Sequence, residues 1–207
     1  PVVMRLGDYH LLCLSYHLSY KNRPCERCLH GAYWHGMALR CVKGSLPASV
    51  VRGAAMYVHR LLGVYDRVDA FVAPCLFMRD KLVEGGFPAG RIHVIPQGVE
   101  ADIPEPTGEK GNYILYFGRI SPEKGLDTLL AAYQDLAPDV DLIQAGKGVG
   151  GYDAALEASV RPGFSQRIRF TGFMQGQALS DLISGALFCL APSRWYDNAP
   201  LSVLESA

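Results

Sequence analysis

The sequence predicts an α/β protein built on parallel sheets. The first observation is a series of short, nearly continuous apolar runs, which are typical of strands covered on both faces, and the second is that amphipathic stretches lie between them, as crossover helices require. This alternation of strand and helix favours right-handed crossovers. The expected strands are the seven apolar runs at residues 2–6, 68–74, 91–96, 113–118, 140–145, 167–170 and 187–191.

Two stretches carry apolar residues at helical spacing, residues 47–65 and residues 122–136. A polar, proline-bearing stretch at residues 100–111 has neither the strand period nor the helix period, so we expect it to link two α/β units. The predicted domains are therefore 1–104 and 105–207. The first half carries 12 basic and 8 acidic residues, and the second half carries the reverse.

The composition excludes several classes of protein. Of the 207 residues, 49% are hydrophobic and 19% are charged, with 20 basic and 20 acidic residues. This balance does not fit a disordered chain, a collagen-like repeat or a strongly basic nucleic-acid binder. No apolar run is long enough to span a bilayer and no secretion signal is visible, so a cytoplasmic location is expected. Both ends look cut, which indicates an internal fragment.

The first candidate site is a strand–helix junction that contains two cations. A strand is expected to end at Gly118, and Ser121 then caps a helix that places Lys124 in its first turn. The helix dipole disfavours a cation there by about 0.3–1 kcal/mol. Together with Arg119 and the free amides of the helix start, Lys124 predicts an anion site. The alternative is that Glu123 offsets Lys124 and that both are solvated.

The second candidate site follows the last expected strand. Asp197 falls in a polar loop and Glu205 lies in a helix that begins near Pro200. A carboxylate can accept hydrogen bonds from two sugar hydroxyls, and a helix start offers amides to a phosphate. Considered alone, the two residues would be an acid that complements the helix dipole and a surface glutamate.

Together these stretches resemble the GT-B glycosyltransferases, and within them family 4 of the retaining, nucleotide-sugar-dependent enzymes. Residues 7–9, 68–74 and 91–99 are similar to the amino-terminal domain of that family. In the second half, five motifs occur in the order of the family: Gly118-Arg119-x4-Lys124-Gly125, Gly146-Lys147-Gly148, Phe170-Thr171-Gly172, Pro192-Ser193 and Asp197-x7-Glu205.

The resemblance implies two Rossmann-like parallel-sheet domains, both incomplete in this fragment, and it implies roles for residues. Arg119 and Lys124 would bind the donor diphosphate, Asp197 would hold hydroxyls of the transferred sugar, and these three form the implied catalytic set. Glu205 would accept hydrogen bonds from the ribose. The other implied donor-binding residues are Gly118, Phe173 and Met174, the last two beside the nucleobase, and Asn198, Leu201 and Ser202.

Three positions depart from the family pattern. Asp197 stands where the family usually has Glu, so its carboxylate reaches one methylene less far. Gly7 stands where a histidine is frequent, so no catalytic histidine is available there. Gln97 replaces the usual Asn, which is a minor change.

The implied activity is retaining transfer of a sugar from a nucleotide-sugar donor to an unidentified acceptor, such as a lipid-linked or polysaccharide precursor of the cell envelope. The resemblance also implies that catalysis requires no cofactor. The alternatives are a nucleotide-sugar epimerase or phosphorylase on the same fold, or a degenerate sugar-nucleotide-binding subunit, which Gly7 would suit. The run from Gly146 to Gly151 also matches the dinucleotide fingerprint, but the next expected strand ends without the acidic residue that this fingerprint needs.

A four-cysteine segment at residues 13–41 is the other unusual feature. Cys13, Cys25, Cys28 and Cys41 have the spacing C-x11-C-x2-C-x12-C. Without a secretion signal, disulfides are disfavoured, and four thiolates suit structural Zn²⁺ or, as an alternative, an iron–sulfur cluster. The remaining interpretation is a set of reduced structural thiols.

The acceptor side is expected in the first half, where residues 21–60 carry seven Lys or Arg and one Glu. This charge predicts contact with an anionic acceptor, such as a lipid-linked phosphosugar, at the inner membrane face. A solvated basic surface is the alternative. Nucleic acid is not expected, because no aromatic binding platform accompanies the charges.

Overall fold

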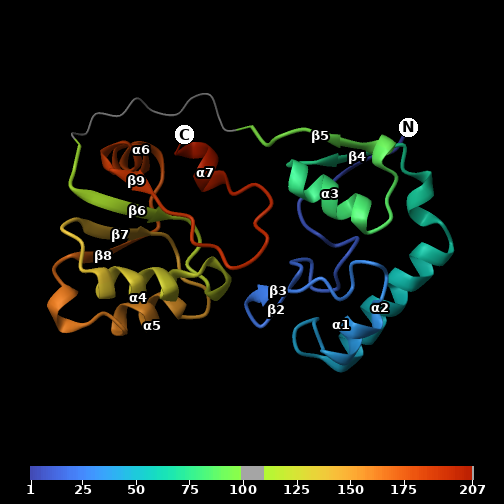
Figure 1. Cartoon of the computed structure of the whole chain (residues 1–207), viewed down its shortest axis with the longest axis horizontal. Coiled ribbons are helices and arrows are strands. Elements are labelled where there is room, and N and C mark those ends of the chain that lie inside the picture. The colour runs from blue at the N-terminus through green and yellow to red at the C-terminus, as the bar shows by residue number, and fades with distance from the viewer. Residues whose placement is uncertain (99–109, 207) are drawn as a thin grey trace. The chain divides into compact units, whose positions relative to one another are not determined.

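The computed structural model describes residues 1–98 and 110–206, and contacts divide them into two compact units (Figure 1). Unit 1 comprises Pro1–Gln97 and the short segment Trp195–Ala199. Unit 2 comprises the described residues up to Arg194 and those from Pro200 onward. The predicted boundary between residues 104 and 105, and most of the predicted linker, lie outside the described residues.

Unit 1 contains a three-stranded parallel sheet in the order β1-β4-β5. Its strands are β1 (Val3–Arg5), β4 (Ala70–Ala73) and β5 (Ile92–Val94). Helix α3 (Leu76–Glu84) follows β4 and buries Met78 and Leu82 in the same core cluster as Phe71. Burial in these strands alternates: Phe71 and Ala73 of β4 are buried, whereas Val3 of β1 and His93 of β5 are exposed.

A long excursion separates β1 from β4 in unit 1. It holds a two-stranded antiparallel hairpin and helices α1 and α2. The elements in chain order are β2 (Ser19–Tyr20), β3 (Arg23–Pro24), α1 (Trp34–Ala38), α2 (Leu46–Leu61) and the 3₁₀ turn η1 (Val64–Arg67), and η2 (Ala89–Arg91) precedes β5. The Ser45 hydroxyl accepts the Ala48 amide and caps α2. No described helix is long and apolar enough to cross a membrane.

Unit 2 contains four parallel strands in the order β8-β7-β6-β9. They are β6 (Tyr113–Phe117), β7 (Asp141–Ala145), β8 (Ile168–Gly172) and β9 (Phe188–Cys189). From β6 the chain adds two strands on one side and then crosses to add β9 on the other. The sheet therefore has a topological switch point between β6 and β9. With the three strands of unit 1, all seven predicted strands are present.

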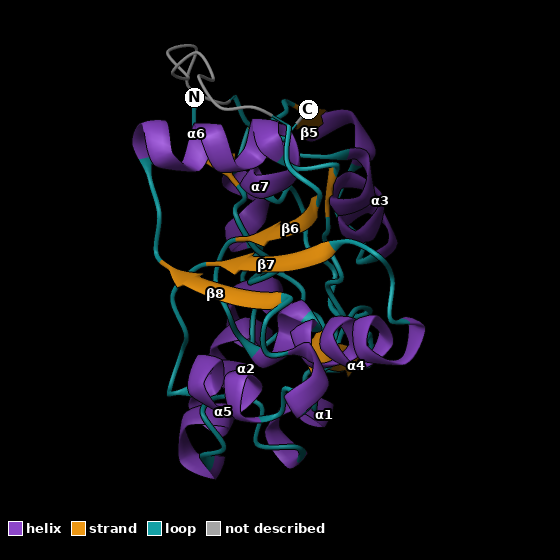
Figure 2. Ribbon diagram, turned by 90° about the vertical axis from the view of Figure 1, so that its left-hand side faces the viewer, coloured by secondary structure: helices purple, strands orange, loops and turns teal. Residues whose placement is uncertain are grey.

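Helices cover both faces of the unit 2 sheet (Figure 2). Helices α4 (Leu126–Leu136) and α5 (Tyr152–Ala158) lie on one face, and α6 (Gly176–Gly185) lies on the other. Successive residues of β6 enter opposite cores: Ile114 and Tyr116 pack in the cluster of α4, whereas Leu115 and Phe117 pack in the cluster of α6. The strands read as continuous apolar runs for this reason. The short elements η3 (Pro122–Lys124), η4 (Pro162–Phe164) and α7 (Leu201–Glu205) complete the unit.

The predicted helix over residues 122–136 is interrupted. Gly125 adopts a left-handed φ of 72° between η3 and α4, so Lys124 ends a 3₁₀ turn instead of lying in the first turn of an α-helix. The predicted side-chain cap at Ser121 is wrong as well, because its hydroxyl donates to Glu123 Oε1 at 2.7 Å and accepts no amide. The carboxylate two residues away competes successfully for this hydroxyl.

Candidate functional site

Unit 2 brings several of the predicted donor-binding residues to one edge of its sheet. Because the four strands are parallel, their carboxyl ends meet there. Gly118 follows β6, Gly146 follows β7, Phe173 follows β8, and the Pro192 loop follows β9. In open α/β sheets, ligands bind outside the carboxyl ends of the strands at the switch point, which here lies between the loops that follow β6 and β9.

Backbone hydrogen bonds join the loops that follow β6 and β7. The Ile120 amide donates to Lys147 O at 3.0 Å, and the Val149 amide donates to Ile120 O at 3.0 Å. Gly118 and Gly146 come so close that a Cβ on Gly146 would lie 1.8 Å from the Gly118 carbonyl oxygen. Only glycine fits at position 146, since the obstructing atom belongs to the backbone.

A second set of contacts joins the β6 loop to the β9 loop. The Arg194 amide donates to Glu123 O at 2.9 Å, and its guanidinium pairs with Asp127 at 2.9 Å. A Cβ on Gly125 would lie 2.2 Å from Pro192 O. Sequence reasoning missed Arg194. The available signal was the acidic first turn of the predicted helix at residues 122–136, which can attract a cation.

Arg119 extends from the β6 loop at the switch point. Its guanidinium is half exposed, at 52%, and pairs with Glu123 at 3.0 Å. The Tyr116 hydroxyl donates to the Arg119 carbonyl at 2.6 Å and fixes the backbone there. An exposed ion pair contributes about 0–1 kcal/mol, so Glu123 holds Arg119 in place without preventing it from meeting a stronger anion. Glu123, two residues beyond Ser121, thus pairs with Arg119.

The two residues implied to flank a nucleobase differ in exposure. Phe173 follows β8 with 70% of its surface exposed, so its ring face is open for stacking. Met174 instead packs against the core cluster of Leu115 and Phe117 under α6. Of the two, only Phe173 offers a ring to a ligand.

Helix α7 carries Leu201, Ser202 and Glu205 in unit 2. The Ser206 hydroxyl hydrogen-bonds the Cys189 thiol, which places the end of α7 beside β9. Burial raises the pKa of Cys189, and the Ser206 bond lowers it by a smaller amount. Glu205 is exposed at this end of the helix.

Asp197 and Asn198 lie in the Trp195–Ala199 segment, which groups with unit 1. The Asn198 amide donates to Gly7 O at 2.7 Å, and the Tyr196 ring packs edge-on against Phe77. The pKa of Tyr9 is raised by burial first, then by Cys75 and Asp197, so the Asp197 carboxylate lies near the buried Tyr9 hydroxyl. The predicted site is thus described in two parts, one in each unit. Sequence reasoning missed Tyr9 and Tyr196.

The glycine-rich run from Gly146 to Gly151 does not form a dinucleotide-binding loop. The Gly148 amide donates to Asp153 Oδ2 at 3.1 Å, where a pyrophosphate would otherwise be needed. The strand that follows, β8, ends in Phe170-Thr171-Gly172 without a carboxylate.

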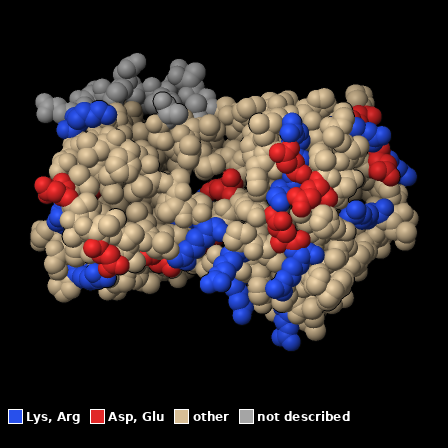
Figure 3. Space-filling view, in the orientation of Figure 1, with Lys and Arg blue, Asp and Glu red and all other residues tan. Residues whose placement is uncertain are grey.

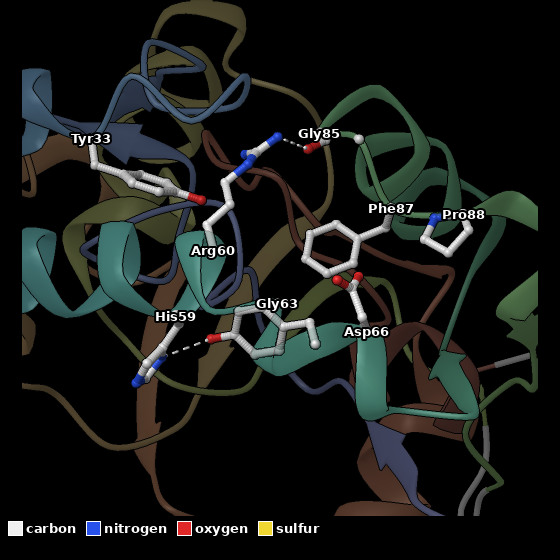
Figure 4. A pocket seen from close by; sticks show the side chains of 10 residues that line it. Tyr33, His59, Arg60, Gly63, Asp66, Gly85, Phe87 and Pro88 are labelled. Carbon is white, nitrogen blue, oxygen red and sulfur yellow. Dashed lines mark hydrogen bonds between the residues drawn. The ribbon is translucent and has the colours of Figure 1, made fainter.

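A separate pocket of about 130 Å³ lies within unit 1 (Figure 4). His59 hydrogen-bonds the Tyr65 hydroxyl at 3.3 Å, and Arg60 donates to Gly85 O at 3.4 Å across it. None of the predicted site residues lines this pocket, and it is smaller than the usual pockets for small-molecule ligands.

The four cysteines proposed as metal ligands all lie in unit 1 as free thiols. Cys13 and Cys28 are buried, and Cys25 and Cys41 are half-buried. As the side chains of the described residues are placed, no three His, Cys, Asp or Glu form a group that could hold a metal ion.

Two units with parallel sheets and flanking helices, one of them with a ligand edge at its switch point, define the GT-B class of protein. Family models agree: residues 111–207 match "Glycosyl transferases group 1" and residues 9–103 match "Glycosyltransferase Family 4". The chain belongs to the family 4 glycosyltransferases of the GT-B fold. Among curated protein sequences, none matches the chain.

Solved structures share this fold at low sequence identity. HepE of Anabaena, solved with UDP-glucose, has 17% identity and a TM-score of 0.64 over all of this chain and 50% of its own. Sucrose-phosphate synthase from Thermosynechococcus elongatus has 20% identity and a TM-score of 0.56, over 68% of this chain and 38% of its own. TarM of S. aureus, solved with UDP, has 16% identity and a TM-score of 0.53, over 68% of this chain and 28% of its own. The chain thus spans about half the length of HepE and a smaller share of the other two proteins.

Replacing Gly146 with Ala should destabilise unit 2, because the new methyl group would push the Gly118 carbonyl away and separate the ends of β6 and β7. Overpacking of this kind costs about 1–3 kcal/mol. Urea unfolding followed by far-ultraviolet circular dichroism measures the effect. The matched control is Gly163→Ala, where nothing lies within 4 Å of the new Cβ. Equal unfolding midpoints for the two variants would contradict the close approach.

Proposed function

We propose that the protein transfers a sugar from a nucleoside diphosphate sugar to an acceptor, with retention at the anomeric carbon. The observation that carries this proposal is the switch-point edge of unit 2, where the half-exposed Arg119 lies in a loop that backbone hydrogen bonds join to the loops after β7 and β9. Such an edge supplies positive charge and fixed backbone amides without a protein nucleophile. Those are the needs of a reaction whose leaving group is a phosphate.

The donor diphosphate is proposed to bind at Arg119 and Lys124. Both lie in the loop and 3₁₀ turn that follow β6, and Lys124 directly precedes the left-handed Gly125 and the start of α4. Guanidinium and ammonium groups make short, charge-assisted hydrogen bonds to phosphate oxygens. HepE, which shares the fold, was solved with UDP and with UDP-glucose, and this supports a nucleoside diphosphate as the ligand class.

The proposed reaction proceeds on one face of the sugar. The bond between the anomeric carbon and the phosphate oxygen breaks, and its electron pair remains on the diphosphate. The acceptor hydroxyl forms the new bond on the same face and gives its proton to the departing phosphate oxygen. Arg119 and Lys124 offset the charge that accumulates there, which is the main contribution such a site can make.

The remaining residues are proposed to orient the donor. Glu205 accepts hydrogen bonds from the ribose hydroxyls, and the exposed Phe173 ring stacks on the base. Asp197 accepts hydrogen bonds from the sugar, with Asn198 beside it. The chain departs from the family at Asp197, whose shorter side chain would favour a sugar held closer to the loop.

The acceptor is proposed to be anionic and lipid-linked, with unit 1 in peripheral contact with the membrane. Residues 27–65 contain no Asp or Glu, and basic side chains are visible over this part of unit 1 (Figure 3). Helices α1 and α2 also expose large apolar side chains, including Trp34, Val51 and Leu61. Basic charge beside exposed apolar residues suits an interface rich in anionic lipid.

Substituting Arg119 or Lys124 with Ala should weaken binding of UDP, the probe used, by about 1.5–3 kcal/mol each, or about 10- to 100-fold. Calorimetry on the intact protein measures this. The matched control is Lys110→Ala, which removes the same charge at the amino-terminal end of β6, where Lys110 donates to Ser184 O at 2.7 Å. Unchanged UDP affinity in both variants would contradict a diphosphate site at Arg119 and Lys124.

A further variant separates the nucleoside from the phosphate part of the site. Glu205→Gln should weaken UDP binding and leave inorganic pyrophosphate binding unchanged, since the ribose is present only in UDP. Equal losses for both probes would mean that Glu205 acts on the diphosphate or on the fold.

The intact protein should release free nucleoside diphosphate from a nucleotide sugar faster when an acceptor is present, and the product should keep the anomeric configuration of the donor. Turnover of a panel of labelled nucleotide sugars, with nuclear magnetic resonance of the product, measures both. Conversion of the donor without an acceptor to an epimeric nucleotide sugar would assign the protein to epimerases. Tight binding without turnover of any donor would indicate a binding subunit.

Vesicle sedimentation tests the membrane contact. The protein should sediment with anionic vesicles at low salt and be released at high salt, at about 1 kcal/mol per contacting Lys or Arg. Leu61→Asp should reduce sedimentation, whereas Leu136→Asp, an exposed leucine on α4 of unit 2, should not. Equal binding to anionic and neutral vesicles, or binding to neither, would contradict the membrane contact and favour a soluble acceptor.

A further inference from the structure

The loop that follows β1 presents two polar side chains at the carboxyl edge of the unit 1 sheet. The Leu6 amide, just beyond β1, still donates to Val72 O at 2.9 Å, and Asp8 and His10 lie beyond that point. Open α/β sheets bind ligands outside the carboxyl ends of their strands. Burial alternates along the loop, since Tyr9 is 3% exposed whereas Asp8 is exposed and His10 is half-buried. The loop therefore turns Tyr9 into the core and leaves its two neighbours accessible.

The Asp8 carboxylate fixes the ring of His10. Asp8 Oδ1 lies 2.6 Å from His10 Nδ1 and accepts the His10 backbone amide at 2.9 Å. An ionised carboxylate can only accept hydrogen bonds, so Nδ1 carries the proton between them. In the neutral ring, Nε2 is then a hydrogen-bond acceptor. One carboxylate oxygen thus sets both the backbone turn and the tautomer of the imidazole.

The backbone on either side of this pair is held by other parts of unit 1. The Tyr9 amide donates to Tyr16 O at 2.9 Å, and Tyr9 O accepts the Cys13 amide at 2.9 Å. Arg52 of α2 donates to His10 O at 3.1 Å, and its guanidinium lies over the Tyr16 ring, 5.0 Å from the centroid. The imidazole is therefore oriented before a ligand arrives, which lowers the ordering cost of binding.

The pair offers two hydrogen-bond acceptors to a ligand. Within the described part of the chain, neither Asp8 Oδ2 nor His10 Nε2 has a hydrogen-bond partner. The Asp8 side chain is 48% exposed and that of His10 is 33% exposed, so a ligand can reach both. Because both atoms accept and Asp8 is negatively charged, the pair suits hydroxyl donors and disfavours a phosphate. A sugar offers hydroxyl groups on adjacent carbons, which matches two neighbouring acceptors.

The space beside the pair is open, and the segment that carries Asp197 borders it. Nothing described lies within 4 Å of the position that a Cβ on Gly7 would take. The segment Trp195–Ala199 groups with unit 1, and the Asn198 side-chain amide donates to Gly7 O at 2.7 Å. The carboxylate proposed to hold the transferred sugar is thus next in sequence to a residue that contacts the loop of Asp8.

We propose that Asp8 and His10 bind hydroxyl groups of the acceptor sugar. This inference rests on the proposed sugar transfer and names the residues that orient its acceptor. His10 Nε2 and Asp8 Oδ2 each accept a hydrogen bond from a hydroxyl group, and no proton passes to them, because the reacting hydroxyl gives its proton to the departing phosphate. The phosphate of a lipid-linked acceptor would be excluded from this pair and left to the basic residues of unit 1.

Glycoside binding to the intact protein in the presence of UDP tests the site, with methyl glycosides of glucose, galactose and mannose as probes. Saturation-transfer nuclear magnetic resonance should detect binding of at least one probe to the wild-type protein. His10→Asn should weaken that binding about tenfold, because asparagine can still donate to Asp8 but has no atom at the position of Nε2. The matched control is His93→Asn, which changes an exposed histidine on β5 of the same sheet and should leave binding unchanged.

UDP calorimetry on the same proteins separates this inference from the proposed function. UDP affinity should be equal in the wild type and both variants. Equal glycoside affinities in the wild type and His10→Asn, or no glycoside binding to the wild type, would overturn the inference and leave the donor site intact. Glycoside binding that depends on His10 in a protein that does not bind UDP would support the inference and contradict the proposed donor site.

A measurement on the wild-type protein covers the case in which His10→Asn does not fold. Nitrogen nuclear magnetic resonance of the labelled histidine rings reports which nitrogen of a neutral imidazole carries the proton. The ring of His10 should be protonated at Nδ1, and the Nε2 signal should shift when the glycoside is added. A neutral ring protonated at Nε2, or an Nε2 signal that does not respond to any of the three glycosides, would overturn the inference.

Discussion

Backbone packed against backbone controls the architecture of the switch-point edge of unit 2. The Gly118 carbonyl occupies the space that a side chain at Gly146 would need, and the Pro192 carbonyl does the same at Gly125. These two close approaches let three loops exchange amide hydrogen bonds directly, so the loops form one rigid surface across the switch point. Arg119 is held on that surface by Tyr116 below and Glu123 beside it. The positive charge is therefore positioned before any ligand arrives, which lowers the ordering cost of binding.

The sequence predicted all seven strands. Burial on both faces explains the continuous apolar runs of β6 and β7. The sequence predicted the helix start near residue 122 less well. Gly125 interrupts the helical pattern with a left-handed φ, and the Ser121 hydroxyl donates to the Glu123 carboxylate instead of accepting a backbone amide. Local spacing carries neither preference, because both depend on the neighbouring loops.

The candidate site shows the same division. The residue types and their order indicated an anion site at Arg119 and Lys124, and parallel topology brings the strand ends that hold them to one edge. Sequence reasoning did not reveal that Met174 enters the core of unit 2, or that Tyr196 and Asn198 group with unit 1, where they contact Phe77 and Gly7. The contacts of Tyr196 and Asn198 join residues more than a hundred positions apart, and no periodic pattern marks them.

Hydrogen exchange of the intact protein, with and without saturating UDP, tests the central claim most directly. The account predicts slower amide exchange in residues 118–126, 190–194 and 200–205 of unit 2, because the ligand would contact these segments. The loop of Gly148 should change less, since its amide already bonds Asp153. Protection confined to unit 1 residues before Gln97, under conditions where UDP is bound, would contradict a donor site at this edge of the sheet.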